Sequence, residues 1–250
     1  MLQSSATRLV AVVVAVVGVA AVIAAGTASA SSSSKPTVLA AASLTQVFPK
    51  VDANANFTFG GSGGLETDIE QGAPADVYAA ANPMDPDQLY VKKLVDKPVE
   101  FATNYIVMVV PPSNPAHITS VNDITKKDVK IVVCNAAQPC GDYASRIWIA
   151  LGITKAATKN VVSYETDVTQ VMAEVELGQA DVGFVYYTDA KSAGNKVKLI
   201  DLPAKSMPGT TDWIAIVKAG KHQAAAKAFV NTVLSAKGQA TLQAAGFGKP

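Results

Sequence analysis

From Thr37 to the C-terminus, short apolar runs alternate with helix-like stretches, and this alternation restricts the fold more than any other feature of the sequence. Strands are expected at residues 38–41, 57–59, 75–80, 106–110, 130–134, 182–187, 197–200 and 213–217. Helices are expected at residues 65–71, 142–151, 168–177 and 223–245. Strands that alternate with helices are typical of an α/β fold with mostly parallel sheets, and the units are too many for one small sheet.

The first thirty residues have the layout of a signal peptide. Residues 9–25 are almost all valine and alanine, Arg8 precedes them, and an Ala-Ser-Ala cleavage site ends at Ala30. We predict a signal peptide at 1–30, cleaved before Ser31, and a flexible tether at 31–36. The alternative is an uncleaved anchor, because the apolar segment nearly reaches the length that spans a bilayer. No cysteine lies at the cleavage site, so a lipid anchor is not expected there.

The balance of charge in the chain indicates which partners it is expected to bind. The whole sequence has 21 Lys plus Arg and 20 Asp plus Glu, and Arg8 is the one charged residue of the predicted signal peptide. The exported part therefore has no net charge, and nucleic acid is not expected as a partner. Any anion that this chain binds must be held by local geometry. The exported part is about 220 residues long, enough for one large domain or two small ones.

Two cysteines, Cys134 and Cys140, lie six residues apart. Outside the cytoplasm such a pair can oxidise and persist, so a disulfide is predicted, with two separate buried thiols as the alternative. A zinc site is not expected, because His117 and His222 are far apart in the sequence and there is no CxxC motif.

Small residues occupy several turns where a strand is followed by a helix. The turn Gly60-Gly-Ser62-Gly-Gly64 fits both the nucleophile elbow of a serine hydrolase and a glycine-rich anion site. Similar turns include Ser43 and Cys140, and Thr166 or Asp167 is expected to cap the next helix. Ligands bind beyond the carboxyl ends of parallel strands, where helix N-termini supply free N–H donors.

Five motifs occur in a characteristic order: Ala40-Ala-Ala-Ser43-Leu44, Gly61-Ser62-Gly63, Gln71-Gly-Ala-Pro-Ala-Asp76, Pro139-Cys140-Gly141 and Gly183-Phe-Val-Tyr186. Together they resemble the molybdate-binding proteins that serve ABC importers, over essentially the whole exported chain. The resemblance implies a type II periplasmic-binding fold, in which two α/β lobes joined by crossing strands close on a tetrahedral oxyanion. Lobe 1 would comprise residues 36–102 and 208–250, and lobe 2 residues 103–207.

The resemblance also implies five ligand-binding positions. Ser43, Ser62 and Tyr186 would donate their hydroxyl groups, and Cys140 and Val168 would donate their backbone N–H groups. All five donors are neutral, which suits a dianion because its oxygens are acceptors only. Each position has a structural alternative: a helix cap for either serine, core packing for Tyr186 and Val168, and half of a disulfide for Cys140.

The function implied is that of a periplasmic or cell-surface solute-binding protein. It would capture molybdate or tungstate and deliver it to an ABC permease and its ATPase. The resemblance implies a monomer with no cofactor and no catalysis. Molybdenum would enter as an oxyanion, so no side chain is expected to ligate a metal cation directly.

Other functions remain alternatives. Sulfate or another tetrahedral oxyanion is the nearest, because cavity size separates sulfate from molybdate and the sequence does not give it. A phosphate binder would need an acceptor for the phosphate proton, and no candidate position supplies one. A serine hydrolase using Ser62 is remote: few strands precede Ser62, and His222 is expected as a solvated residue at the head of a helix.

Two departures from the family pattern concern the binding loops. Pro49 is expected to end the first helix near Phe48, which makes that helix short. Cys134 and Cys140 bracket the third binding loop, so a bridge between them would hold a loop that supplies a ligand N–H.

Overall fold

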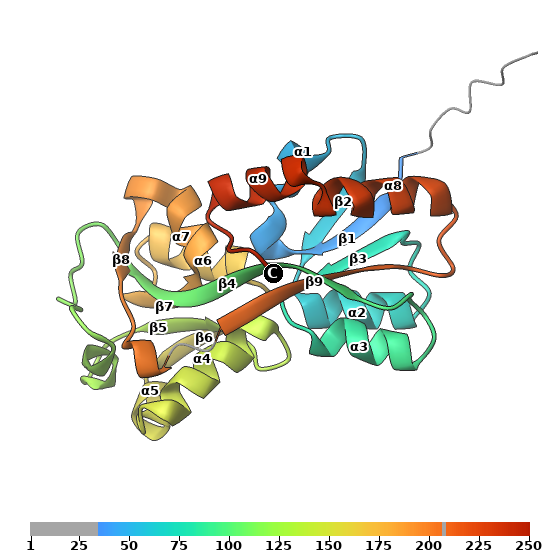
Figure 1. The fold of residues 1–250 in the computed structure, drawn as a ribbon. Coiled ribbons are helices and arrows are strands. Elements are labelled where there is room, and N and C mark those ends of the chain that lie inside the picture. The colour runs from blue at the N-terminus through green and yellow to red at the C-terminus, as the bar shows by residue number, and fades with distance from the viewer. Residues whose placement is uncertain (1–34, 207–208) are drawn as a thin grey trace, which may run out of the picture. The chain divides into compact units, whose positions relative to one another are not determined.

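The computed structural model describes residues 35–206 and 209–250. The predicted signal peptide and most of the predicted tether lie outside these residues. Two groups of strands and helices, here called the first and second lobes, are joined by two long strands (Figure 1).

The first lobe is built around a parallel sheet. Strand β1 (Thr37–Ala41) lies between β2 (Asn56–Gly60) and β3 (Val77–Ala80) and is parallel to both. In Figure 1, helices α8 and α9 lie on one side of this sheet and α2 and α3 on the other. The helices of this lobe are α1 (Phe48–Val51), α2 (Ser62–Glu70), α3 (Met84–Val91), α8 (Gln223–Leu234) and α9 (Ala236–Ala245), with the 3₁₀ turn η1 (Ala42–Leu44) after β1.

The second lobe repeats this plan. Strand β5 (Ile131–Cys134) lies between β6 (Val161–Glu165) and β7 (Val182–Tyr186), again in parallel. Its helices are α4 (Pro139–Ala150), α5 (Thr154–Lys159), α6 (Val168–Glu176) and α7 (Tyr187–Ala193). Its 3₁₀ turns are η2 (Val121–Thr125), η3 (Gly194–Lys196) and η4 (Ala204–Ser206).

Strands β4 (Val99–Val110) and β9 (Gly209–Ile216) cross between the lobes. β4 is antiparallel to β9 from Val99 to Tyr105, and antiparallel to β7 and to β8 (Lys198–Ile200) over its remaining residues. β9 also pairs with β3 of the first lobe, antiparallel. The predicted α/β fold with two lobes and crossing strands is confirmed, although parallel pairing is confined to the strands within each lobe. The predicted residue bounds of the lobes stay a prediction.

An aromatic cluster fixes the chain that follows the first binding turn. The ring of Phe48 is fully buried, with centroid distances of 5.5 Å to Phe229, 5.7 Å to Phe101 and 6.2 Å to Phe57. Burying a phenylalanine side chain stabilises a fold by about 1.5–3 kcal/mol. Phe48 therefore anchors α1 against β2, β4 and α8, a few residues after Ser43.

The prediction that Pro49 ends the first helix is wrong. The chain makes the turn η1, and α1 then begins at Phe48 with Pro49 in its first turn. Proline is accepted there because N–H groups of the first turn have no acceptor within the helix. Ser43 therefore lies in a single 3₁₀ turn rather than in an α-helix.

The helix expected over 223–245 is two helices. The chain bends at Ser235, which ends α8 and begins α9, and the Ser235 Oγ accepts a hydrogen bond from the Gly238 N–H at 3.1 Å.

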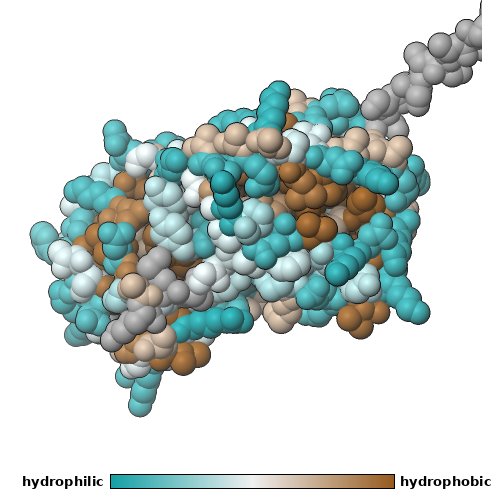
Figure 2. All heavy atoms as spheres, in the orientation of Figure 1, coloured by the Kyte–Doolittle hydropathy of each residue, from teal (hydrophilic) through white to brown (hydrophobic). Residues whose placement is uncertain are grey.

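Among the described residues, each helix is too short or too polar to span a lipid bilayer. On the face shown in Figure 2, hydrophilic side chains are interspersed with smaller hydrophobic areas.

Candidate functional site

A small cavity lies where the carboxyl ends of the parallel strands of both lobes face one another. The turns after β1, β2 and β3 line it from the first lobe, and those after β5, β6 and β7 line it from the second. Its lining residues are Ala41, Ala42, Ser43, Gly60, Gly61, Ser62, Ala81, Pro139, Cys140, Asp167, Val168 and Tyr186. All five predicted site residues are among them, although they are far apart in the sequence.

The cavity is narrow. The space that the centre of a water-sized sphere can occupy is about 10 Å³, close to the least that holds one water molecule. Larger hollows of about 280 and 250 Å³ lie elsewhere. The first is lined by Asp76 and His222, and the second contains Ser43 without the other four predicted residues. The small cavity is therefore the candidate site.

Neither serine caps a helix. Ser43 lies within η1, is 7 % exposed, and its Oγ has no hydrogen-bond partner among the described residues. Ser62 is the first residue of α2, whose N-cap is Gly61. The Ser62 Oγ accepts a hydrogen bond from the Ala81 N–H at 3.1 Å, so its own hydrogen is free to be donated. Both hydroxyl groups can therefore donate to a ligand.

Tyr186 ends β7 and is fully enclosed. Its phenol oxygen is buried and has no hydrogen-bond partner among the described residues. Burial raises the pKa of Tyr186 well above its usual value, and nearby Tyr143 and Asp212 raise it further. The phenol therefore keeps its proton and can act as a donor.

Two helices of the second lobe begin at the cavity. Cys140 is the second residue of α4, and Val168 is the first residue of α6, which is capped by Asp167. No acceptor is found for either N–H in the described part of the chain. The first N–H groups of a helix have no acceptor within it, and they carry partial positive charge. Both positions therefore present free N–H donors to the cavity.

Asp167, the one carboxylate among the residues that line the cavity, is already engaged. Asp167 Oδ1 accepts from the backbone N–H groups of Thr169 and Gln170 at 2.8 and 3.2 Å, and Oδ2 accepts from Gln170 Nε2 at 3.1 Å. The prediction that Thr166 or Asp167 caps this helix is confirmed for Asp167. The cavity thus offers donors, which suits a ligand whose oxygens are acceptors only.

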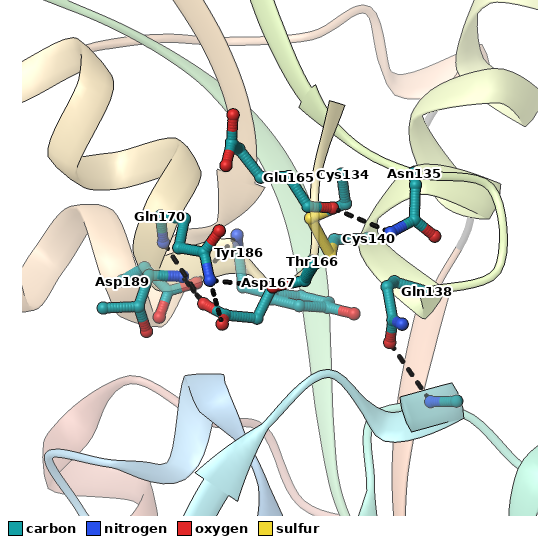
Figure 3. Close-up of a disulfide and its surroundings, with 12 residues drawn as sticks. Cys134, Asn135, Gln138, Cys140, Glu165, Thr166, Asp167, Gln170, Tyr186 and Asp189 are labelled. Atoms are coloured by element: carbon teal, nitrogen blue, oxygen red, sulfur yellow. Dashed lines mark hydrogen bonds between the residues drawn. A yellow bond between two sulfur atoms is a disulfide. The ribbon is translucent and has the colours of Figure 1, made fainter. Parts of the chain in front are cut away.

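A disulfide joins Cys134, at the end of β5, to Cys140, in the first turn of α4 (Figure 3). The two Cα atoms are 5.7 Å apart, within the usual range for a bridge. It closes the loop of residues 135–139, which leads directly to the Cys140 N–H. The bridge therefore restrains one of the donor loops.

Sequence reasoning missed two residues that support the site. Ala81 supplies the N–H that orients the Ser62 hydroxyl, and Gln138 reaches across to α2. Their partners lie 19 and 75 residues away in the sequence. Ala81 acts through its backbone and leaves no side-chain signal, and Gln138 differs from other glutamines only in its place before Pro139-Cys140.

Comparison with known protein families gives a match over nearly the whole chain. The family described as bacterial extracellular solute-binding protein matches residues 19–248. The match takes in the turns that line the cavity.

Several relatives with similar sequences are molybdate-binding proteins by name. ModA of Mycobacterium tuberculosis is 38 % identical over 223 residues, covering 85 % of this chain and 84 % of the relative. ModA of Haemophilus influenzae is 31 % identical over 232 residues, covering 85 % and 89 %.

Solved structures with the same fold are periplasmic binding proteins. The substrate-binding domain of a putative molybdenum ABC transporter from Clostridium difficile is 31 % identical, with a TM-score of 0.61 and coverage of 86 % of this chain and 99 % of that one. The Azotobacter vinelandii periplasmic molybdate-binding protein has a TM-score of 0.76 at 21 % identity, covering 86 % and 100 %. The sulfate-binding protein SubI of Mycobacterium tuberculosis has a TM-score of 0.71 at 18 % identity, covering 86 % of this chain and 86 % of that one. The fold is therefore the type II periplasmic-binding fold, and binders of different oxyanions share it.

Proposed function

We propose that this chain, which belongs to the family of bacterial extracellular solute-binding proteins, captures molybdate or tungstate outside the cytoplasm. It delivers the anion to an ABC permease and its ATPase. The protein itself performs no catalysis and needs no cofactor. The names of its relatives support this assignment.

One observation carries the proposal. Ser43 Oγ and Tyr186 OH are buried beside the same cavity, and neither has a hydrogen-bond partner among the described residues. Leaving a buried polar group unpaired costs about 1–3 kcal/mol. A ligand that accepts a hydrogen bond from both hydroxyl groups removes that cost, and a tetrahedral oxyanion has oxygens enough to do so.

The proposed binding set consists of Ser43, Ser62 and Tyr186 through their hydroxyl groups and Cys140 and Val168 through their N–H groups. A fully deprotonated dianion accepts from each of them, and hydrogen bonds to a charged group are worth about 1.5–3 kcal/mol each. The N-termini of α2, α4 and α6 share the negative charge. No buried lysine or arginine is needed for this set.

The same donors would serve sulfate, so sulfate is the principal alternative. A bound hydrogen phosphate fits less well, because it presents a proton and the five proposed positions are all donors. Selection between molybdate and sulfate then depends on how closely the two lobes approach around the anion.

A ligand panel tests the proposal. The exported chain is mixed with molybdate, tungstate, sulfate or phosphate, and its melting temperature is measured. At about 100 times Kd, binding adds about 2.7 kcal/mol, which corresponds to roughly 5–10 °C for a chain of this size. Molybdate and tungstate should produce this shift and sulfate should not. Equal shifts with sulfate would make the protein a general oxyanion binder, and no shift with any of the four would reject the proposal.

The serine hydrolase alternative has little support. Ser62 Oγ accepts from Ala81 N–H, and His222 lies in a different hollow, where its Nδ1 is 2.9 Å from Asp76 Oδ2. His222 is half-buried in this pair, contrary to its expected place in solvent. A nucleophilic serine needs an adjacent base to take its proton. A fluorophosphonate probe should therefore leave Ser62 unlabelled.

Export of the protein and its monomeric state belong to the same proposal. The protein is expected to lose residues 1–30 and to act as a monomer at the cell surface or in the periplasm. Mass spectrometry of the exported protein should give Ser31 as the first residue. A mass that includes residues 1–30 would favour the uncleaved anchor.

A further inference from the structure

One side chain of the second lobe forms a hydrogen bond to the first lobe beside the site. Gln138 is the N-cap residue of α4, and its Oε1 accepts from the Gly63 N–H at 3.1 Å (Figure 3). Gln138 is 7 % exposed, so the side chain is enclosed by this contact. The bond therefore forms between the turn after β5 and the first turn of α2.

Among the described residues, the Gly63 N–H has no other acceptor. Gly63 is the second residue of α2, and an N–H at that position has none within its own helix. Ser62 and Tyr186 have hydroxyl groups for the anion, whereas this N–H is taken by Gln138. When the lobes separate, water must replace Gln138 as its partner.

The two turns approach so closely that their contact requires glycine. A Cβ at Gly61 would overlap the Gln138 Oε1 and the carbonyl oxygen of Thr166. A Cβ at Gly63 would overlap the carbonyl oxygen of Ala137. Gly61 has φ −66° and Gly63 is helical, so neither needs glycine for its backbone angles. Space between the lobes is what excludes a side chain.

The loop that carries Gln138 is restrained on its own side. The disulfide Cys134–Cys140 closes it, the Gln138 N–H donates to Asn135 O at 3.0 Å, and the Asn135 side chain donates to Glu165 O at 3.1 Å. A side chain held on a restrained loop loses little freedom when it forms its bond. Gln138 is therefore already oriented toward α2 before its hydrogen bond forms.

We infer that Gln138 is a latch residue that holds the two lobes closed over the anion without touching it. This inference rests on the proposed function, since it gives closure a purpose. A ligand that binds only the closed form has an affinity proportional to the fraction of the protein that is closed. A change that lowers this fraction therefore weakens binding. Gln138 therefore acts as a positioning residue that governs how slowly the anion leaves.

The first test follows the bond itself and needs no ligand. Hydrogen exchange of the Gly63 amide is measured by NMR in the parent, in Gln138→Ala and in Gln88→Ala, a control at an exposed glutamine on α3. A net hydrogen bond of ordinary strength changes the ratio of closed to open protein by about 2- to 10-fold. Gln138→Ala should speed exchange at Gly63 by about that factor, and Gln88→Ala should not change it. Equal exchange in all three, or an unprotected Gly63 amide in the parent, would overturn the latch.

The second test separates closure from binding. With whichever oxyanion the ligand panel identifies, Gln138→Ala should raise the dissociation rate by about 2- to 10-fold and leave the association rate within about 2-fold. Gln138→Glu keeps the shape and the acceptor but adds a negative charge near the anion. Its affinity relative to the parent should be low at pH 8 and should rise as the pH is lowered and the new carboxyl becomes protonated.

The results distinguish this inference from the proposed function. If no oxyanion binds the parent, the proposed function fails, and the exchange of the Gly63 amide still decides whether Gln138 closes the lobes. If molybdate binds the parent and all three variants with the same dissociation rate, the function stands and the latch fails.

Discussion

At the scale of single residues, the hydroxyl groups of Ser43, Ser62 and Tyr186 differ in how they are held. Ser43 Oγ and Tyr186 OH have no hydrogen-bond partner in the described part of the chain, whereas Ser62 Oγ is oriented by the Ala81 N–H. Each should donate one hydrogen bond to a charged ligand. Ser43→Ala, Ser62→Ala and Tyr186→Phe should each weaken molybdate binding by about 10- to 100-fold.

Isothermal titration and thermal unfolding of the three variants check this prediction. Without ligand, Ser43→Ala and Tyr186→Phe should unfold at or above the parent's temperature, because each removes a buried group that lacks a partner. Ser62→Ala should unfold lower, because it leaves the Ala81 N–H without its acceptor. Parent-like affinity in any one variant would remove that residue from the binding set.

Asp85 should make stability depend on pH. It is 4 % exposed and its Oδ2 has no hydrogen-bond partner among the described residues. Burial raises the pKa of Asp85 to about 6; a hydrogen bond at Asn82 opposes this shift, and the charge of Asp142 adds to it. A pKa raised in the folded state means that the folded protein binds more protons than the unfolded chain between about pH 4 and 6. This contribution to stability is therefore present at low pH and is lost as pH rises through 6.

Replacing this carboxyl isolates its effect. Asp85→Asn should stabilise the protein relative to the parent at pH 8, and by about 1 kcal/mol less at pH 5. Urea unfolding at the two pH values measures the difference. Asp87→Asn, at an exposed position of the same helix, is the matched control. An Asp85→Asn effect that does not change with pH would show that Asp85 is ionised throughout.

At the scale of elements, the first turn of α2 offers a matched pair of substitutions. A Cβ at Gly63 would overlap the Ala137 carbonyl oxygen in the other lobe, whereas one at Gly64 would lie 3.9 Å from Gln138 Nε2. Alanine favours a helix over glycine by about 1 kcal/mol, so Gly64→Ala should not lower the stability of the ligand-free protein. Overpacking costs about 1–3 kcal/mol, so Gly63→Ala should weaken molybdate binding by about 10- to 100-fold. Gly64→Ala should bind as the parent does.

Calorimetric affinities and melting temperatures of the two alanine variants test this pair. Equal affinities would mean that the two turns can move apart in the anion-bound protein without weakening binding. The distinction matters because both glycines belong to one motif in the sequence, and only the contact across the lobes makes them different.

Much of the element order can be predicted from the sequence, because each buried strand is a short apolar run and Asp167 is a strong cap. The errors have local causes. Pro49 can end one helix or begin the next, and sequence alone does not say which. Residues 223–245 contain no proline, and the only local signal for the bend is Ser235, a residue type that can cap a helix but also occurs inside one. Gln138 could not be predicted as a contact residue, because a bond to a residue 75 positions away depends on how the lobes meet.

At the scale of the whole molecule, the balance of charge should govern how the anion arrives. The chain has 21 basic and 20 acidic residues, and Arg8 belongs to the predicted signal peptide, so the exported protein has no net formal charge. Electrostatic steering of association needs a field that extends beyond the surface, and it falls steeply with salt. The proposed donors are neutral groups in a closed cavity, where screening by salt is weak.

Association of molybdate should therefore depend little on ionic strength. Stopped-flow measurements in about 10 and 200 mM NaCl, where the screening length falls from about 30 Å to less than 10 Å, should give rates within about threefold of each other. Gln46→Lys places a positive charge at an exposed position beside η1, and it should raise the rate at low salt and make it salt-dependent. If the parent itself slows tenfold or more on adding salt, a local positive field attracts the anion, and the neutral donors are not the whole of its recognition.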